Sequence, residues 1–283
     1  MKMNTKTPET TFERREIKYI LTQAQKAAFM QAVESYLHPD ENGTGGNYQL
    51  MSLYFDSPRK DFYRSRWFRL PVRKKLRIRR YITSDTTLWG EEKVFIEIKE
   101  HTETINYKRR VLLSVDDTFK LLNGDKLEAS FSPEDQEIID EISSIVAEFQ
   151  ITPSAVTSYI RQAYKVKKQD WWIRITFDHN IRFRTDHLGL EWRGEKDKNL
   201  IDEGLEIMEI KVKGELPEWT QKALESCGIE QVSFSKYAHA LEQGLGDELV
   251  PSVEIMEHGE LFQDHKKGLL PAEIWKQRKL WSA

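Results

Sequence analysis

Basic residues alternate with apolar residues in one short segment of the chain, where Lys75, Arg77 and Arg79 are separated by Leu76 and Ile78. Since successive side chains of a β-strand point to opposite faces, the three basic residues would share one face of a strand. A guanidinium group can bind phosphate oxygens through two hydrogen bonds, and a lysine ammonium binds them as a point charge. The segment therefore predicts a strand with one face suited to phosphate.

The same alternation recurs in segments that lie far apart in the sequence. These segments contain Arg14, Glu16 and Lys18; Glu97 and Lys99; Arg174, Thr176 and Asp178; and Glu209, Lys211 and Lys213. Predicted helices are available to cover the apolar faces, so the charged faces would line a shared interior. Because unpaired cations are costly to bury, that interior must hold water, carboxylates or an anionic ligand. Arg and Lys with a few Glu would suit a polyphosphate bound through a divalent metal.

The bulk composition excludes several classes of protein. The 283 residues carry a formal net charge of −3, so no global basic field would attract the chain to nucleic acid or to anionic lipid. The single cysteine, Cys227, cannot form an intramolecular disulfide and fits a reducing compartment. No apolar run approaches the roughly 18 residues of a transmembrane helix, and Met1–Thr11 lacks the apolar core of a signal peptide. We expect a cytoplasmic protein without a membrane segment.

The hydrophobic patterns predict an α+β fold with roughly eight strands and several helices. We expect strands at 12–21, 48–55, 74–81, 94–99, 104–115, 155–165, 171–178, 181–185 and 205–212. We expect helices at 23–37, from 116 to 123, 133–149, from 217 to 228 and from 233 to 244. Thr22, Asp116 and Ser132 are the predicted N-caps of helices. The tight link Asp178–Asn180 predicts a hairpin. Because most strands meet by turns, the sheet should be antiparallel.

Seven short motifs occur in an order that resembles a known family. They are Glu16-Ile17-Lys18, Leu76-Arg77-Ile78-Arg79, Glu97-Ile98-Lys99, Ser158-Tyr159-Ile160-Arg161, Arg174-Ile175-Thr176-Phe177-Asp178, Met208-Glu209-Ile210-Lys211 and Phe234-Ser235-Lys236-Tyr237. Each motif alone is weak, whereas the ordered set is specific. It resembles the VTC domain, which is the polyphosphate polymerase branch of the triphosphate tunnel (CYTH-like) metalloenzymes, from about Phe12 to Leu241.

The resemblance implies a closed antiparallel eight-stranded β-barrel, or tunnel, with flanking helices. It also implies transfer of the γ-phosphoryl group of ATP to a growing polyphosphate chain, with release of ADP and with Mn²⁺ or Mg²⁺ as cofactor. The implied catalytic phosphate ligands are Arg77, Arg79, Lys99, Arg161, Arg174 and Lys236, and the further phosphate-binding residues are Lys18, Lys108, Tyr159, Lys211 and Ser235. Glu209 would hold the metal, with Glu97 or Glu16 as the next candidates.

Two positions depart from the family pattern. Arg14 stands where tunnel hydrolases usually have the first of two alternating glutamates, and one fewer carboxylate fits a polymerase better than a two-metal hydrolase. Ser233 stands where the family often has a basic residue, so one contact at the tunnel mouth is in question. Lys75 is expected near a mouth of the tunnel, and Lys74 and Arg80 on the outer face.

Several alternatives stay open. Arg77 and Arg79 could lie on the solvated face of an edge strand, and the Glu–Lys motifs could be ordinary cross-strand ion pairs. The chain could instead be a tunnel triphosphatase that hydrolyses inorganic or nucleoside triphosphate, or a polyphosphate or nucleotide sensor without turnover. We expect ATP, ADP and polyphosphate as partners and no nucleic acid. The expected organisation is a disordered lead over 1–11, a catalytic domain over 12–244 and a tail over 245–283 that contains a short amphipathic helix.

Overall fold

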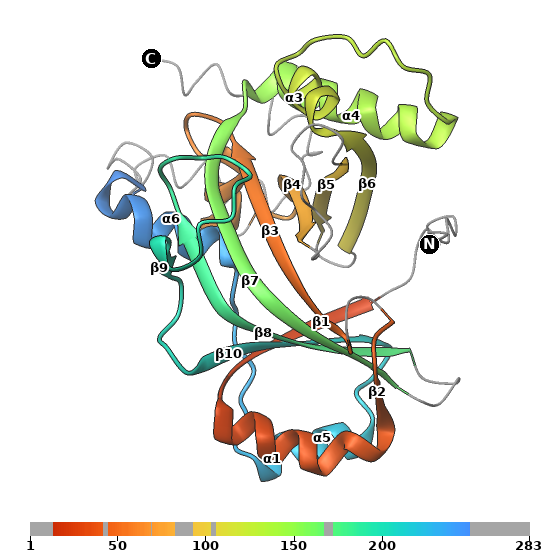
Figure 1. Cartoon of the computed structure of the whole chain (residues 1–283), viewed down its shortest axis with the longest axis vertical. Coiled ribbons are helices and arrows are strands. Elements are labelled where there is room, and N and C mark those ends of the chain that lie inside the picture. The colour runs from red at the N-terminus through yellow and green to blue at the C-terminus, as the bar shows by residue number, and fades with distance from the viewer. Residues whose placement is uncertain are drawn as a thin grey trace.

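Eight strands form one continuous antiparallel sheet in the computed structural model, which describes residues 14–41, 45–68, 70–82, 93–102, 106–166 and 172–249 (Figure 1). Along the sheet the order is β1 (Arg14–Thr22), β10 (Leu205–Lys213), β8 (Ile173–Arg184), β7 (Thr152–Val166), β3 (Asn47–Asp56), β4 (Arg73–Ile82), β5 (Lys93–His101) and β6 (Asn106–Ser114). Two short strands extend it, β2 (Leu37–Pro39) beside β7 and β9 (Lys198–Asn199) beside β8. The predicted antiparallel α+β fold is confirmed.

The register of the strands gathers the charged residues on one face, which we call the inner face. Arg77 of β4 lies opposite Glu97 of β5 and opposite Tyr54 of β3. Toward the other edge of the sheet, Lys18 of β1 lies opposite Glu209 of β10 on the same face. Because paired residues in neighbouring strands point to the same face, the separate motifs meet in space.

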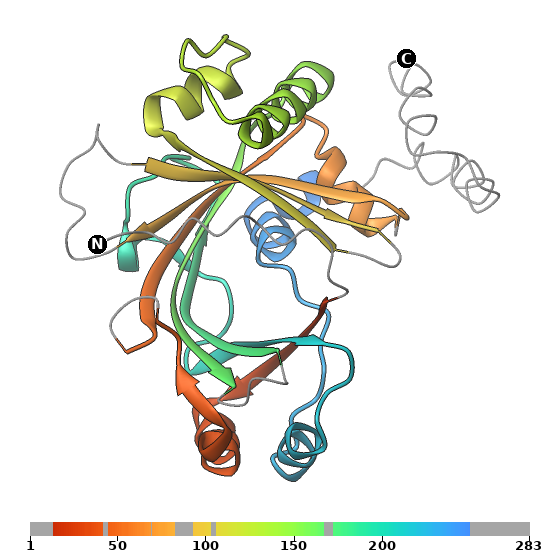
Figure 2. The ribbon, with the colours of Figure 1, turned by 90° about the vertical axis from the view of Figure 1, so that its right-hand side faces the viewer.

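Helices cover the opposite, outer face of the sheet in two places (Figure 2). The helices α3 (Val115–Leu122) and α4 (Pro133–Phe149) pack on one apolar cluster, which includes Leu76 and Ile78. The helices α1 (Gln23–Val33) and α5 (Glu218–Ser226) pack on a second cluster, formed by β1, β8 and β10. Burying a Leu or Ile side chain contributes about 1.5–3 kcal/mol, so these two clusters fix which face of each strand points inward.

A third cluster lies on the inner face and involves two more helices. These are α2 (Asp61–Trp67), which follows β3, and α6 (Lys236–Leu245), near the end of the described chain. The third cluster joins Tyr237 and Leu241 of α6 to Leu50, Tyr54 and Tyr159 of the sheet. In Figure 2, α6 (blue) accordingly lies within the curve of the sheet. This placement brings the start of α6 among the charged residues.

Local capping signals explain where several helices begin. Thr22 caps α1 through a capping box with Gln25, and Ser132 caps α4, whose first residue is a proline, as predicted. The prediction for α3 was wrong by two residues, because its N-cap is Ser114 and not Asp116. The Ser114 hydroxyl accepts a hydrogen bond from the Asp117 amide at 3.0 Å, which leaves Asp116 in the first helical turn.

The predicted closed barrel is not confirmed, since the sheet is open between its two edge strands among the described residues. Strands β1 and β6 are its two edges, and no backbone pairing joins them within the described residues. A side-chain contact does reach across, because Lys99 of β5 lies 3.0 Å from Glu16 of β1. Alternation reveals which face of a strand is polar, but closure depends on strand tilt and shear, which alternation does not report.

The predicted hairpin at Asp178–Asn180 is also wrong, because β8 continues through it. Asn180 has φ of +49°, and the pairing register of β7 with β8 shifts between Ser158 and Ile160. Asn tolerates the left-handed conformation, so it marks a β-bulge here as readily as a turn.

Two predicted segments lie outside the described residues. These are the lead over 1–11 and almost all of the tail, including its amphipathic helix. Among the helices in the described part of the chain, none is long and apolar enough to cross a membrane.

Candidate phosphate-binding site

The inner face brings the predicted site residues together in three ion-pair clusters, each built around a buried or partly buried carboxylate. The first is the Glu97 cluster. Arg77 donates from Nε and Nη2 to the Glu97 carboxylate at 2.9 and 2.6 Å, and Lys108 Nζ lies 2.6 Å from the other oxygen. Arg77 also donates to the Tyr54 hydroxyl at 3.2 Å.

The electrostatics of the Glu97 cluster favour the ionised carboxylate. Burial alone would raise the pKa of Glu97, but Arg77 and Lys108 outweigh it and hold the pKa well below its usual range. Burial lowers the pKa of Lys108 to about 7, although Glu97 partly opposes the shift. Lys108 is therefore a lysine whose charge can change near neutral pH.

The second cluster is the Asp178 cluster, which joins β7, β8, β10 and α6. Asp178 is fully buried and accepts hydrogen bonds from Arg161 at 2.6 and 2.7 Å and from Lys236 at 2.6 Å. Glu209 contacts the same two cations at longer distances, 3.2 Å to Arg161 and 3.3 Å to Lys236. Burial would raise the pKa of Glu209, but Lys236 and Arg161 hold it well below its usual range.

The third cluster is the Glu16 cluster, where β1, β10 and β5 meet. The Glu16 carboxylate lies 3.0 Å from Lys99, 3.2 Å from Lys18 and 3.8 Å from Lys211. Burial lowers the pKa of Lys211 to about 8, with Glu16 and Glu209 opposing the shift. One carboxylate thus serves three lysines, which leaves this end of the inner face positively charged.

Arg79 differs from the other arginines because it has no carboxylate partner among the described residues. Its side chain is 7% exposed and donates to the Ser52 hydroxyl at 3.3 Å and to the Tyr159 hydroxyl at 2.8 Å. Its hydrogen-bond partners are neutral and Glu97 acts on it only through space, so an anionic ligand would supply the charged partner that this buried guanidinium lacks. Arg79 is therefore the strongest candidate on the inner face for contact with an anionic ligand.

Arg174 lies at the margin of the site and outside the three clusters. It donates to the Asp40 carboxylate at 2.8 Å and to the Tyr48 hydroxyl at 2.9 Å. Lys165 lies 3.2 Å from the same Asp40. Arg174 therefore points to the inner face as predicted, but its main partners come from β3 and from the residue after β2.

Sequence reasoning gave no role to Tyr54 or Asp40, and it placed Asp178 and Lys75 on charged strand faces without naming their partners; all four contact predicted site residues. Asp178 did stand in one of the alternating segments, so its face was predictable although its partners were not. Lys75 Nζ donates to the Ser235 hydroxyl at 2.8 Å. Ser235 is also the N-cap of α6, where its hydroxyl accepts from the Ala238 amide at 3.3 Å.

The donor set fits a divalent cation that is bound together with phosphate. Among the described residues, no group of three or more His, Cys, Asp or Glu side chains could hold a metal by itself. Mg²⁺ at phosphate sites is instead commonly held by one or two carboxylates and by the substrate's own oxygens. Glu209 suits this role, because its contacts with Arg161 and Lys236 are longer than those of Asp178 and could yield to a metal ion.

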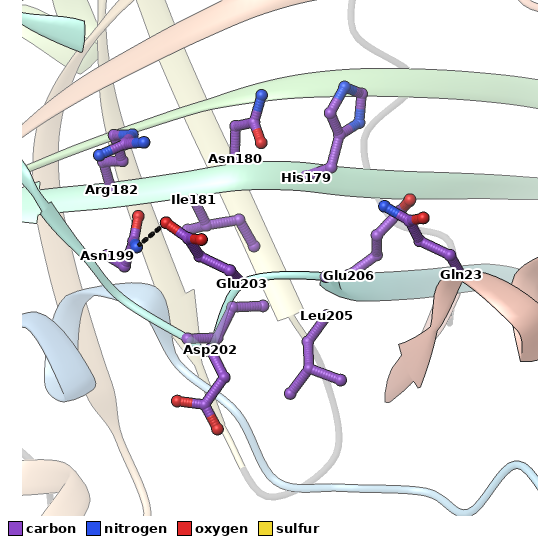
Figure 3. Close-up of a pocket in the computed structure, with 12 residues that line it drawn as sticks. Gln23, His179, Asn180, Ile181, Arg182, Asn199, Asp202, Glu203, Leu205 and Glu206 are labelled. Carbon is purple, nitrogen blue, oxygen red and sulfur yellow. Dashed lines mark hydrogen bonds between the residues drawn. The ribbon is translucent and has the colours of Figure 1, made fainter. Parts of the chain in front are cut away.

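A separate pocket of about 350 Å³ lies beside β8 and β10 (Figure 3). His179, Asn180, Glu203 and Glu206 are among its lining residues, and none of the predicted phosphate ligands lines it. Its carboxylates and amides offer few cations to a polyphosphate. The inner face and not this pocket is therefore the candidate phosphate-binding site.

The chain was compared with known sequences, solved structures and family models. A search of curated protein sequences found no match to it. Among solved structures, a putative adenylate cyclase from Bacillus halodurans is 14% identical, with a TM-score of 0.40 over 79% of this chain and 95% of that chain. A protein from Pyrococcus horikoshii OT3 is 15% identical, with a TM-score of 0.41 over 81% of this chain and 99% of that chain.

A family model gives the decisive comparison. The model of the VTC domain matches residues 13–244, which include every strand of the sheet and every residue of the three ion-pair clusters. The family predicted from the seven ordered motifs is thereby confirmed. The chain belongs to the VTC domain family.

Proposed function

We propose that the chain is a metal-dependent polyphosphate polymerase, which transfers the γ-phosphoryl group of ATP to a growing polyphosphate chain and releases ADP. The observation that carries the proposal is the inner face itself. Basic side chains from seven strands and α6 outnumber the carboxylates there, and Arg79 is buried without a carboxylate partner among the described residues. Membership of the VTC domain family supports the same ligand class.

The reaction needs positioning and charge neutralisation more than a protein nucleophile. A terminal phosphate oxygen of the polyphosphate chain attacks the γ-phosphorus, a new P–O–P bond forms, and the bond to the β-phosphate oxygen breaks so that ADP leaves. Arg77, Arg79 and Arg161 would bind the phosphate oxygens of the triphosphate. Their hydrogen bonds to Glu97, Tyr159 and Asp178 hold the guanidinium groups in place before the substrate arrives.

The carboxylates would offset the repulsion among the cations when no substrate is bound. Glu97, Asp178 and Glu16 each neutralise cations in the absence of substrate, and the cations keep spare N–H donors for phosphate. Lys236, held between Asp178 and Glu209, would contact the phosphates from the α6 side. A divalent cation held by Glu209, with Glu16 or Glu97 as further candidates, would neutralise charge on the phosphates when bound.

A product assay tests the proposal. Pure protein is incubated with ATP and either Mn²⁺ or Mg²⁺, the metal is chelated, and the products are separated by gel electrophoresis and by chromatography. We expect long-chain polyphosphate and one ADP released for each phosphoryl group that is transferred. Orthophosphate in place of polyphosphate would make the chain a triphosphatase, and tight ATP or polyphosphate binding without any product would make it a sensor.

A further inference from the structure

Lys75 is a half-buried basic residue of the inner face that has no part in the reaction described above. It lies on β4, two residues before Arg77, and its ammonium donates to the Ser235 hydroxyl at 2.8 Å. No ion pair of Lys75 with a carboxylate occurs among the described residues. In contrast, Lys99 pairs with Glu16, and Lys108 pairs with Glu97.

The register of the sheet places Lys75 in a row of three lysines. Lys75 of β4 lies opposite Lys99 of β5, and Lys99 lies opposite Lys108 of β6. Like charges that face one another across strands destabilise a sheet. Neighbouring strands are about 4.8 Å apart, so the row spans about 10 Å of the inner face. An extended anion with several charges would relieve the repulsion along its whole length.

The surroundings of Lys75 add further positive charge. Lys18 donates to the Phe234 carbonyl at 3.0 Å, so two lysines converge on the residues that precede α6. The first turn of α6 contains no acidic residue that could offset them. Burial, followed by repulsion from Lys18 and Lys99, lowers the pKa of Lys75 well below its usual range. The N-terminus of α6 carries partial positive charge, so it would attract an anion to the same place.

Exposure increases from the centre of the site toward this row. The side chains of Arg161 and Lys236 are 6% and 9% exposed, whereas those of Lys99 and Lys108 are 34% and 41% exposed. The deeply buried cations are suited to the reacting phosphates, and the row is suited to the part of a chain that continues toward solvent.

We propose that Lys75 extends the phosphate-binding row of Lys99 and Lys108 and contacts a linear inorganic polyphosphate beyond the three phosphates nearest the reaction. This inference rests on the proposed function and adds chain-length preference to it. Lys75 is the residue that distinguishes a long chain from a triphosphate, because it makes no ion pair with a carboxylate among the described residues and lies two residues along β4 from Arg77.

The test compares the affinity of the full chain for two ligands, tripolyphosphate and long-chain polyphosphate, by isothermal titration calorimetry. We expect Lys75→Gln to weaken the binding of long-chain polyphosphate by about tenfold, which is the effect of losing one charge-assisted contact. Its affinity for tripolyphosphate should change less than about twofold, well under the tenfold that 1.4 kcal/mol represents. Lys75→Arg should retain the affinity for the long chain.

Lys74→Gln is the matched control, because Lys74 is the neighbouring residue on the outer face and contacts Glu100 and Glu141. It should leave both affinities unchanged. Equal losses for the two ligands in Lys75→Gln, or unchanged binding of the long chain, would overturn the subsite. A lower melting temperature of ligand-free Lys75→Gln would also overturn it, since Lys75 would then serve mainly to hold α6.

The titration, combined with the product assay described above, separates the subsite from the proposed function. If the wild-type chain makes polyphosphate and Lys75→Gln binds the long chain as tightly as wild type, only the subsite fails. If the wild-type chain binds long-chain polyphosphate, loses that binding in Lys75→Gln and makes no polyphosphate, only the polymerase activity fails.

Discussion

Arg77 and Arg79 lie two residues apart on β4, yet their charge environments differ. Arg77 is paired with the buried Glu97, whereas Arg79 contacts only the hydroxyls of Ser52 and Tyr159. Removing one partner of a buried ion pair leaves the other unpaired, which costs about 3–5 kcal/mol when no other partner remains. Removing Arg79, which makes no ion pair among the described residues, leaves no carboxylate without its hydrogen-bonding cation.

We therefore expect the two alanine variants to lose activity alike and to differ in stability. Arg77→Ala and Arg79→Ala should each lower the rate of phosphoryl transfer at least about 100-fold, as the loss of a transition-state contact does. In the ligand-free protein, Arg77→Ala should cost about 2–3 kcal/mol, because Glu97 keeps Lys108, and Arg79→Ala should cost less than about 1 kcal/mol. Denaturant unfolding measures both. Equal destabilisation by the two variants would mean that the Glu97 pair does not distinguish them.

Lys211 should make phosphate binding depend on pH. Its pKa is about 8 in the ligand-free protein, so above that pH the ammonium is largely neutral. A bound phosphate would raise this pKa, so binding should take up protons between about pH 8 and the ordinary lysine value near 10.4, and affinity should fall as pH rises through this window.

Calorimetry of tripolyphosphate binding at pH 9 in two buffers of different ionisation enthalpy measures this proton uptake. Lys211→Arg, which stays charged, should remove most of the uptake while keeping the affinity. An identical uptake in wild type and in Lys211→Arg would assign the proton to another group, such as Lys108.

At the scale of single residues, the sequence predicted which face each charged side chain would occupy. It did so for Arg77, Glu97 and Glu209 because a strand alternates strictly. It did not predict that Asp178 would hold Arg161 and Lys236, because that contact depends on where β8 and α6 meet in space.

Helix α6 is held in place by its first two residues: Lys236 belongs to the site, and Tyr237 contacts β3. The hydroxyl of Tyr237 donates to the fully buried Asp56 of β3, which also accepts from the amides of Phe62 and Tyr63 in α2 at 2.9 and 3.0 Å. Burial raises the pKa of Asp56 to about 6 against these hydrogen bonds. Asp56 thus joins β3, α2 and α6 through one carboxylate.

Asp56→Ala should therefore lower the free energy of unfolding by about 2–3 kcal/mol, because buried amide and hydroxyl donors lose their acceptor. The exposed Asp116 in the first turn of α3 provides a matched control, and Asp116→Ala should stay within about 0.5 kcal/mol of wild type. Urea denaturation followed by circular dichroism compares them. A loss in Asp56→Ala no greater than in the control would contradict this role of the carboxylate.

Most elements were predictable because their signals are local. Alternation marked the strands, and Thr22 and Ser132 marked two helix starts. The errors arose where one local signal serves two structures. Asn180, in its left-handed conformation, belongs to a bulge within β8 and not to a hairpin, and only the pairing with β7 distinguishes the two.

The whole molecule concentrates positive charge on the inner face although its net charge is −3. This separation makes the proposed polyanion site compatible with an acidic chain. Closure of the sheet was not predictable from the motifs, because among the described residues β5 reaches the edge strand β1 through the Lys99–Glu16 contact, whereas no backbone pairing joins the edges β1 and β6.

The basic side chains of the inner face repel one another, so a bound polyanion should stabilise the fold. A ligand at 100 times its dissociation constant adds about 2.7 kcal/mol to stability, which for a chain of this size raises the melting temperature by about 5–10 °C. We expect such a rise with tripolyphosphate, measured by differential scanning calorimetry. An equal rise with sodium chloride at matched ionic strength would show general screening and would contradict a specific site.

The central claim is that the inner face is where the phosphates bind. A crystal structure with a non-hydrolysable ATP analogue and Mn²⁺ tests it most directly. We expect the triphosphate within hydrogen-bonding distance of Arg77, Arg79, Arg161 and Lys236, with Mn²⁺ bound between the phosphate oxygens and Glu209. A triphosphate bound outside the inner face, for instance in the pocket beside β8 and β10, would show that the inner face is not the phosphate-binding site.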